Sequence, residues 1–73
     1  MDNIHKIDAC GLTNPQPALL AYKAIGSLIG GAIQVLVDST TGRDNVIRTA
    51  QKAGWQVSIQ TRPDGVFQIL LTK

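Results

Sequence analysis

The sequence predicts an α/β (α+β) fold, a two-layer sandwich in which a mixed four-stranded sheet carries two helices on one face. Stretches with the apolar patterns of strands alternate with two stretches that have helical apolar spacing. A Pro-Asp-Gly turn joins the last two strands as a hairpin. The element order is therefore β-α-β-α-β-β. Strand–helix–strand crossovers are right-handed and give parallel strands, so both helices are expected on one face, with the other face open, if the second strand lies between the two strands that it connects.

The first part of the chain predicts a strand, a helix and a second strand. Residues 4–9 alternate in polarity, as in a short strand. Residues 15–29 form the first predicted helix, and Gly30 and Gly31 are expected to end it. The apolar residues at helical spacing in it are Pro17, Leu20, Ala21, Ala24 and Leu28, and they form its predicted inner face. Residues 33–38 are β-branched and almost continuously apolar, which is typical of a strand inside a sheet.

The second part predicts a helix followed by a hairpin. Residues 42–53 have helical spacing, and Thr41 with Asp44 approximates a capping box at the start. The inner face of this helix is predicted to consist of Val46, Ile47, Ala50 and Ala53. Residues 55–61 alternate in polarity and residues 66–71 are apolar, so both segments are predicted strands. The turn between them is expected to hold Gly65 at positive φ.

Composition limits the classes of function. The 73 residues form a single predicted domain, residues 1–73, with 44% hydrophobic residues and a net charge of +2. The basic residues are spread along the chain, which argues against nucleic-acid binding. One cysteine permits no intramolecular disulfide, and His5 with Cys10 does not make a metal site. No cofactor site, signal peptide or membrane-spanning run is recognised, so a cytoplasmic protein is expected.

The segment Asn14-Pro15-Gln16-Pro17 is the strongest local signal in the chain. Proline suits the first turn of a helix, and Asn14 is predicted to be its N-cap. The free backbone N–H groups of Gln16 and Ala18 would then face position 14, an arrangement that suits an anion. The same pattern is also typical of a rigid helix start without further function, and both interpretations remain open.

Residues 7–17 read Ile-Asp-Ala-Cys-Gly-Leu-Thr-Asn-Pro-Gln-Pro and, together with Gly31, Asp38 and Gly54, resemble the TusA-like family, also called SirA/YedF. The resemblance covers essentially the whole chain and implies the sandwich described above. It also implies a sulfur carrier whose partners are proteins of sulfur relay or selenium metabolism. The binding residues that it implies are Gly11, Leu12, Pro15, Gln16 and Pro17.

The sequence departs from this family at the reactive position. Family members that carry sulfur hold a persulfide on a cysteine directly before the first proline, and the matching residue here is Asn14. An amide cannot carry sulfur, so impaired persulfide chemistry is expected. Cys10 stands where the family more often has arginine. It is either a small loop residue or a substitute nucleophile that folds over the helix N-terminus.

Two hypotheses of function follow from the resemblance. The chain is either a sulfur-relay protein with impaired chemistry, acting through Cys10 or descended from carriers that act through position 14, or a non-catalytic protein-binding module. The module hypothesis includes the N-terminal domain of a longer YedF-type protein. It requires a partner surface, which is expected around Leu12, Leu19 and the open sheet face. A small RNA-binding domain is a third hypothesis, and the low positive charge disfavours it.

Overall fold

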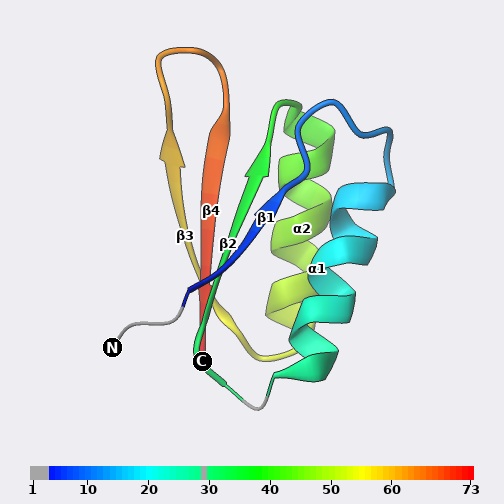
Figure 1. The fold of residues 1–73 in the computed structure, drawn as a ribbon, viewed down its shortest axis with the longest axis vertical. Helices are drawn as coiled ribbons and strands as arrows, with labels where there is room; N and C mark the ends of the chain where they lie inside the picture. Colours follow the sequence, from blue (N-terminus) through cyan, green and yellow to red (C-terminus); the bar gives the residue numbers. More distant parts are fainter. Residues whose placement is uncertain (1–3, 29) are drawn as a thin grey trace.

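The computed structural model describes residues 4–28 and 30–73 and has the predicted two-layer architecture (Figure 1). Its elements are β1 (Ile4–Asp8), α1 (Gln16–Ser27), β2 (Ala32–Val37), α2 (Thr40–Lys52), β3 (Gln56–Thr61) and β4 (Phe67–Thr72). The sheet order is β1-β2-β4-β3, with β1 parallel to β2 and β4 antiparallel to both of its neighbours. Both helices lie on the same side of the sheet (Figure 1), so the predicted fold class is confirmed.

The last strand in the sequence lies inside the sheet. β4 pairs with β2 on one side and with β3 on the other, which leaves β1 and β3 as the edges. The register places Val35 beside Ile69 and Ile33 beside Leu71. Paired residues share a face of a sheet, and all four of these side chains are fully buried beneath the helices. The two central strands therefore supply most of the large core side chains.

The helices contribute small residues to this core. Ala21 and Ala24 of α1 and Val46 and Ala50 of α2 are buried, which confirms these parts of the predicted inner faces. Small side chains let a helix approach a sheet closely, so the large aliphatic residues of β2 and β4 fill the space between the layers. Leu28, Ile47 and Ala53 pack at the margin of the core and are partly buried.

The start of α1 differs from the prediction. Pro15 occupies the N-cap position, and no side chain caps the helix, so the prediction that Asn14 is the N-cap was wrong. The Asn14–Pro15 peptide bond is cis. The N–H of Gln16 donates to the carbonyl oxygen of Thr13 at 2.9 Å. A backbone carbonyl therefore satisfies the donor that an asparagine cap would have served.

The end of α1 also differs. Leu28 is the C-cap residue in an extended conformation, and the predicted last residue, Ile29, lies outside the described part of the chain. Gly31 does not cap the helix; it exchanges two backbone hydrogen bonds with Lys73, each of 3.0 Å. Its φ of +120° is a conformation that glycine adopts readily. Gly31 thus extends the pairing of β2 with β4 instead of ending α1.

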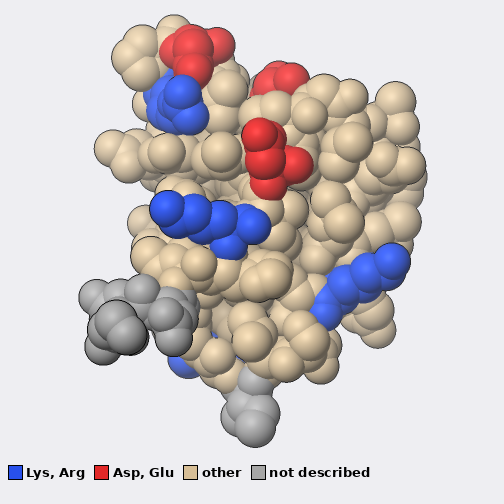
Figure 2. Space-filling view, in the orientation of Figure 1, with Lys and Arg blue, Asp and Glu red and all other residues tan. Residues whose placement is uncertain are grey.

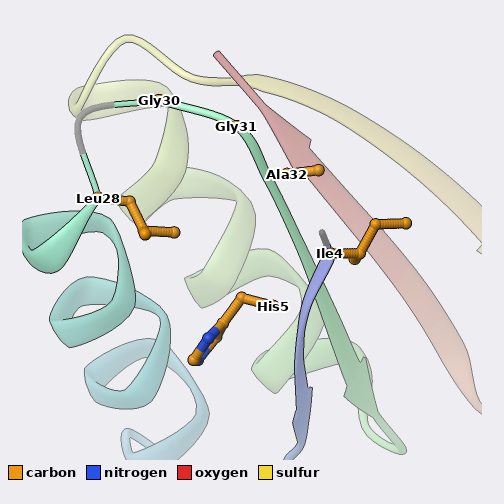
Figure 3. Close-up of a pocket in the computed structure, with 6 residues that line it drawn as sticks. All are labelled: Ile4, His5, Leu28, Gly30, Gly31 and Ala32. Carbon is orange, nitrogen blue, oxygen red and sulfur yellow. The ribbon is translucent and has the colours of Figure 1, made fainter. Parts of the chain in front are cut away.

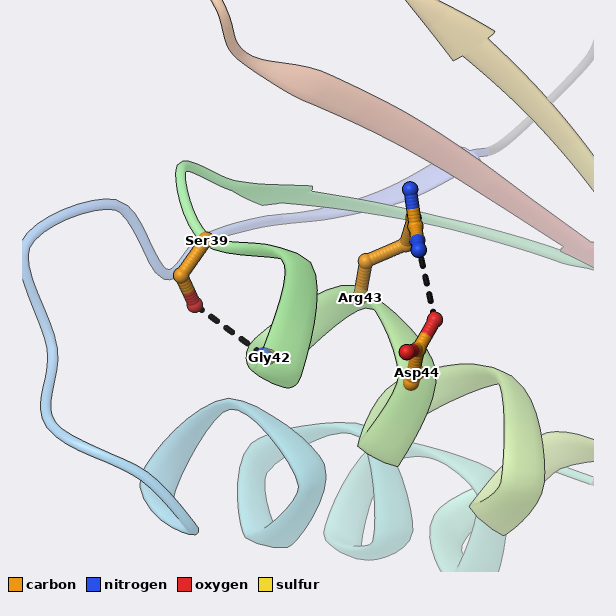
Figure 4. A network of polar contacts seen from close by, with 4 residues as sticks. All are labelled: Ser39, Gly42, Arg43 and Asp44. Atoms are coloured by element: carbon orange, nitrogen blue, oxygen red, sulfur yellow. Dashed lines mark hydrogen bonds and ion pairs between the residues drawn. The ribbon is translucent and has the colours of Figure 1, made fainter.

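The cap of α2 is supplied by Ser39. Its side-chain oxygen accepts a hydrogen bond of 3.0 Å from the N–H of Gly42 (Figure 4). The predicted capping box of Thr41 with Asp44 was wrong, because the helix begins at Thr40, two residues before the predicted start, and Ser39 is its N-cap. Asp44 instead makes an ion pair of 2.9 Å with Arg43 on the helix surface (Figure 4).

The β3–β4 turn follows the prediction. Gly65 has a φ of +87°, and its N–H donates to the carbonyl of Arg62 at 3.0 Å. The Asp64 carboxylate accepts a bond from the N–H of Val66 and pairs with the Arg62 side chain. The hairpin is therefore closed by the local chemistry that its sequence indicates. Among the described residues, no helix is long and apolar enough to span a bilayer.

Candidate functional site

The loop between β1 and α1 is tied to the sheet by two carboxylates. The N–H of Cys10 donates to Asp8 Oδ1 at 3.1 Å, and the N–H of Gly11 donates to Asp38 Oδ2 at 3.0 Å. Asp38 directly follows β2, and Gly11 has a φ of +79°, which suits a residue without a side chain. The loop is thereby held against the end of the neighbouring strand, close to the start of α2.

Asn14 lies against the first turn of α2. Its side-chain oxygen is 3.2 Å from the position that a Cβ on Gly42 would occupy, and Pro17 Cγ is 3.7 Å from the same point. Position 14 therefore lies where the N-termini of two helices meet. The partial positive charge at a helix N-terminus favours an oxygen or an anion there.

The contribution of α2 was not recognised from the sequence. A glycine in the first turn of a helix is a weak hint that another segment approaches closely, and Gly42 is such a residue. The hint could not identify the approaching segment, because Asn14 and Gly42 are far apart in sequence and only the fold brings them together.

Most donors near position 14 are already used. The N–H of Gly42 is bonded to Ser39 and that of Gln16 to Thr13. The N–H of Leu19 bonds to the carbonyl of Pro15, so in the first turn of α1 only Ala18 has an N–H without an acceptor among the described residues. The predicted pair of free donors at Gln16 and Ala18 is therefore reduced to one.

Cys10 lies in negatively charged surroundings. Its side chain is half-buried, and burial is the largest cause that raises the thiol pKa above its usual value. A hydrogen bond with the Asp8 carboxylate and the negative charges of Asp8 and Asp38 raise this pKa further, while Arg62 opposes them. Because the thiolate is the nucleophile, these surroundings keep Cys10 in its unreactive form at neutral pH.

The predicted site residues thus fall into separate environments. Asn14 and Pro17 contact α2, whereas Gly11 and Cys10 are bonded to Asp38 and Asp8. Pro15 is the N-cap of α1, and it supplies the carbonyl to which Leu19 bonds.

An apolar surface lies beside the loop. A shallow cavity of about 300 Å³ is lined by Leu12, Gln16, Leu19, Leu20 and Lys23. Leu19 is 52% exposed, and Tyr22, one turn further along α1, is 67% exposed. Large exposed apolar side chains grouped in this way are typical of a protein-binding surface.

A second cavity has no cysteine in its lining. It has a volume of about 490 Å³ and is lined by Ile4, His5, Leu28, Gly30, Gly31 and Ala32. The imidazole of His5 is directed toward the α1 side of the sheet, whereas Ile4 points to the other side (Figure 3). Within the described part of the chain, no group of three or more His, Cys, Asp or Glu residues could hold a metal ion.

The basic side chains form no extended patch on the face shown in Figure 2. Lys and Arg are scattered there, separated by uncharged surface or beside an acidic side chain (Figure 2). Two of the arginines, Arg43 and Arg62, make ion pairs with a neighbouring aspartate. This face therefore offers no continuous basic path for a nucleic-acid backbone.

Comparisons with known proteins agree with this fold. Residues 5–73 match the family model described as Sulfurtransferase TusA. The crystal structure of a SirA-like protein from Desulfitobacterium hafniense superposes with a TM-score of 0.89 and 33% sequence identity, covering 96% of each chain. A search of curated proteins found no match.

Proposed function

Because the chain belongs to the TusA family of sulfurtransferases, we propose that it is a sulfur-relay protein whose own persulfide chemistry is impaired. The observation that carries the proposal is Asn14. A neutral amide occupies the position of the carrier cysteine, and its oxygen lies at the first turn of α2. The family supports a protein of the sulfur-carrier type, and the substitution concerns only the step at which sulfur becomes covalently bound.

That step requires a thiolate. A carrier thiolate attacks the outer sulfur of a donor persulfide, a new S–S bond forms, and the donor cysteine leaves as a thiolate. The amide of Asn14 has no sulfur with which to form this bond. Cys10 is poorly suited to replace it, because burial and two carboxylates raise its pKa. A neutral thiol is a weak nucleophile, and loading of the natural protein is expected to be slow or absent.

In this proposal the protein retains the ability to bind partner proteins. Leu12 and Leu19 line the cavity beside the loop, and Tyr22 extends the apolar surface along α1. Proteins of sulfur relay or selenium metabolism are the proposed partners, and they would contact this surface next to Asn14. We also propose a cytoplasmic location, because a single unpaired cysteine suits a reducing compartment.

The experiment compares sulfur loading among matched thiol variants. The natural protein, Asn14→Cys, Cys10→Ser and the double variant are incubated with a cysteine desulfurase and cysteine, and intact masses are measured without reductant. Asn14→Cys and the double variant are expected to gain one sulfur atom, because the new thiol has two helix N-termini beside it and a pKa below about 8.5. Thr13→Cys places a thiol one residue away and is the matched control, for which little loading is expected.

Efficient loading of the natural protein that disappears in Cys10→Ser would overturn the proposal. In that case Cys10 is the nucleophile and Asn14 supports it. Loading of Thr13→Cys equal to that of Asn14→Cys would show that the position before Pro15 has no special role.

The second candidate is a protein-binding module without a part in sulfur transfer. The exposure of Leu19 and Tyr22 favours it, because binding through these residues needs no thiol. The same experiment separates the two functions. If the thiol of Asn14→Cys titrates at a low pH but receives no sulfur from any desulfurase, the module is favoured.

A further inference from the structure

The two edges of the sheet differ in how well they are protected against pairing with a further strand. An exposed strand edge can pair with another strand, and charged side chains or proline usually prevent this. The β1 edge carries Lys6 and Asp8, both exposed. The β3 edge, Gln56–Thr61, reads Gln-Val-Ser-Ile-Gln-Thr and has no charge, proline or glycine. It is also the outermost strand on the side of the sheet away from β1 (Figure 1).

Hydrogen bonding within the sheet determines which groups of β3 are free. The N–H of Arg62 donates to the carbonyl of Val66 at 2.9 Å, just beyond the paired residues Thr61 and Phe67. In an antiparallel pair, every second residue directs both backbone groups toward its neighbour. Gln56, Ser58 and Gln60 therefore bond to β4. Val57 and Ile59 direct their N–H and C=O groups to the outer edge.

The other side of β4 gives the same alternation. Lys73 exchanges both backbone bonds with Gly31, which extends the β2–β4 pairing. The odd-numbered residues of β4 thus bond to β2, and the even-numbered ones are left to bond to β3. Since Ser58 is paired with Leu70, its backbone groups also point inward.

We propose that β3 pairs with β3 of a second copy of this chain, antiparallel, about a two-fold axis at Ser58. In this register, Val57 of one copy exchanges both backbone bonds with Ile59 of the other. Ser58 lies opposite Ser58 of the second copy, in a pair without backbone bonds between its members. Residues that lie opposite each other in adjacent strands share a face of the sheet. The helices of both copies would therefore lie on the same side of one continuous sheet.

In this register, side chains of β3 in one copy lie opposite side chains of similar polarity in the other copy. On the helix side, Ile59, which is 45% exposed in a single copy, would pack against Val57 of the other copy. On the open side, Gln56 would lie opposite Gln60, so amide groups meet amide groups. A register centred on Ile59 would instead place Val57 opposite Thr61. No like charges meet in the proposed pairing, which makes a second copy a better occupant than a charged peptide.

The proposed dimer leaves the Asn14 site open. α1 and the loop before it lie on the far side of the molecule from β3 (Figure 1). A single pair of short strands buries little surface compared with the roughly 1,200–2,000 Å² of stable interfaces. The dimer is therefore expected to be weak and to depend on concentration. The inference is independent of whether position 14 handles sulfur.

The decisive experiment is disulfide cross-linking at single positions of β3 in a Cys10→Ser background. Ser58→Cys is expected to form a disulfide-linked dimer under mild oxidation, because residues in such a pair have Cα atoms about 4.5 Å apart. Disulfides need Cα separations of about 4.4–6.8 Å. Gln60→Cys and Gln56→Cys are exposed on the same face and are the matched controls. In the proposed register, each of these residues lies four positions along the strand from the same residue of the other copy, a separation of about 13 Å. Little cross-linking is therefore expected.

A measurement without new cysteines completes the test. In sedimentation velocity, the mean mass of the natural protein is expected to rise toward that of a dimer with concentration. Ser58→Lys should remain monomeric, because it brings two ammonium groups together at the axis. His5→Lys, at the β1 edge, should behave like the natural protein. A natural protein that is monomeric at every concentration, dimers that persist in Ser58→Lys, or equal cross-linking at residues 56, 58 and 60 would overturn the proposal.

Discussion

Asn14 and Gly42 lie in contact across the space between the β1–α1 loop and α2. The Asn14 side-chain oxygen is 3.2 Å from the point where a Cβ on Gly42 would lie, and the Ser39 cap oxygen is 2.9 Å from it. The absence of a side chain at position 42 therefore accommodates both oxygens. This relationship joins the candidate site to the N-terminus of a second helix.

Gly42→Ala is expected to destabilise the protein. Alanine in a helix is normally favoured over glycine by about 1 kcal/mol. Here its Cβ would displace the Ser39 cap, whose loss costs about 1 kcal/mol, and it would also crowd Asn14. The first two effects cancel, so the crowding of Asn14 decides the result, and we expect it to leave a net loss of about 1 kcal/mol in the free energy of unfolding, measured by urea denaturation.

The matched variant for this prediction is Asn14→Ala. Alone it should change the free energy of unfolding by less than about 0.5 kcal/mol, because Asn14 is not a helix cap. Combined with Gly42→Ala it should recover part of the loss, since one of the two crowding oxygens is removed. A more stable Gly42→Ala protein would contradict the close approach.

Ser39→Ala should cost about 1 kcal/mol of stability, because the N–H of Gly42 loses its acceptor at the start of α2. Thr41→Ala removes the hydroxyl of the residue that the sequence pattern indicated as the cap. It should have a smaller effect, since Thr41 lies inside the helix. Thermal or urea unfolding of the two variants checks this order. An equal or larger loss for Thr41→Ala would show that the helix is capped differently.

Gly65→Ala should destabilise the β3–β4 hairpin by about 1–2 kcal/mol, because a φ of +87° is unfavourable for a residue with a side chain. No atom beyond the two adjacent residues lies within 4 Å of the added Cβ, so the effect comes from the backbone conformation. Gly26→Ala is the control. It also has open space around the added Cβ but lies in α1, where alanine should stabilise by about 0.5–1 kcal/mol. Opposite signs for the two variants in urea unfolding are the expected result.

Cys10 should react slowly with iodoacetamide at neutral pH, and its rate should rise only at a pH above the usual range for a thiol. Asp8→Asn removes both a negative charge and a carboxylate acceptor that raise the Cys10 pKa. The pKa should therefore fall, and alkylation at pH 8 should become faster. Asp44→Asn, whose carboxylate is paired with Arg43, is the control and should leave the rate unchanged.

The same shift predicts the direction of a pH effect on stability. Folding raises the Cys10 pKa, so the folded protein binds this proton more tightly than the unfolded chain. The associated stability is present below the unfolded pKa and is lost as pH rises through the folded pKa. Urea unfolding of the natural protein and of Cys10→Ser at pH 7 and pH 10 measures this contribution. A pH profile that Cys10→Ser leaves unchanged would show that the thiol does not contribute.

Local patterns predicted the elements because their causes are local. The alternation in β3 and the apolar run in β2 reflect which side chains face the helices, and the observed strands begin or end within one residue of the predicted bounds. The conformation of Gly65 was predicted correctly because an Asp-Gly pair between two strands favours it. The helix caps were predicted less well. Several residues near each end can serve as caps, and the backbone path chooses among them.

The sequence by itself determined that the chain is a two-layer sandwich and that position 14 has no thiol, since both follow from residue types and their spacing. The tertiary structure decided that β4 lies between β2 and β3. It also decided that Asn14 meets Gly42 and that the charge of Asp38 helps to raise the Cys10 pKa. These features depend on contacts between residues distant in sequence. Such contacts form only when the layers pack, and no local pattern encodes them.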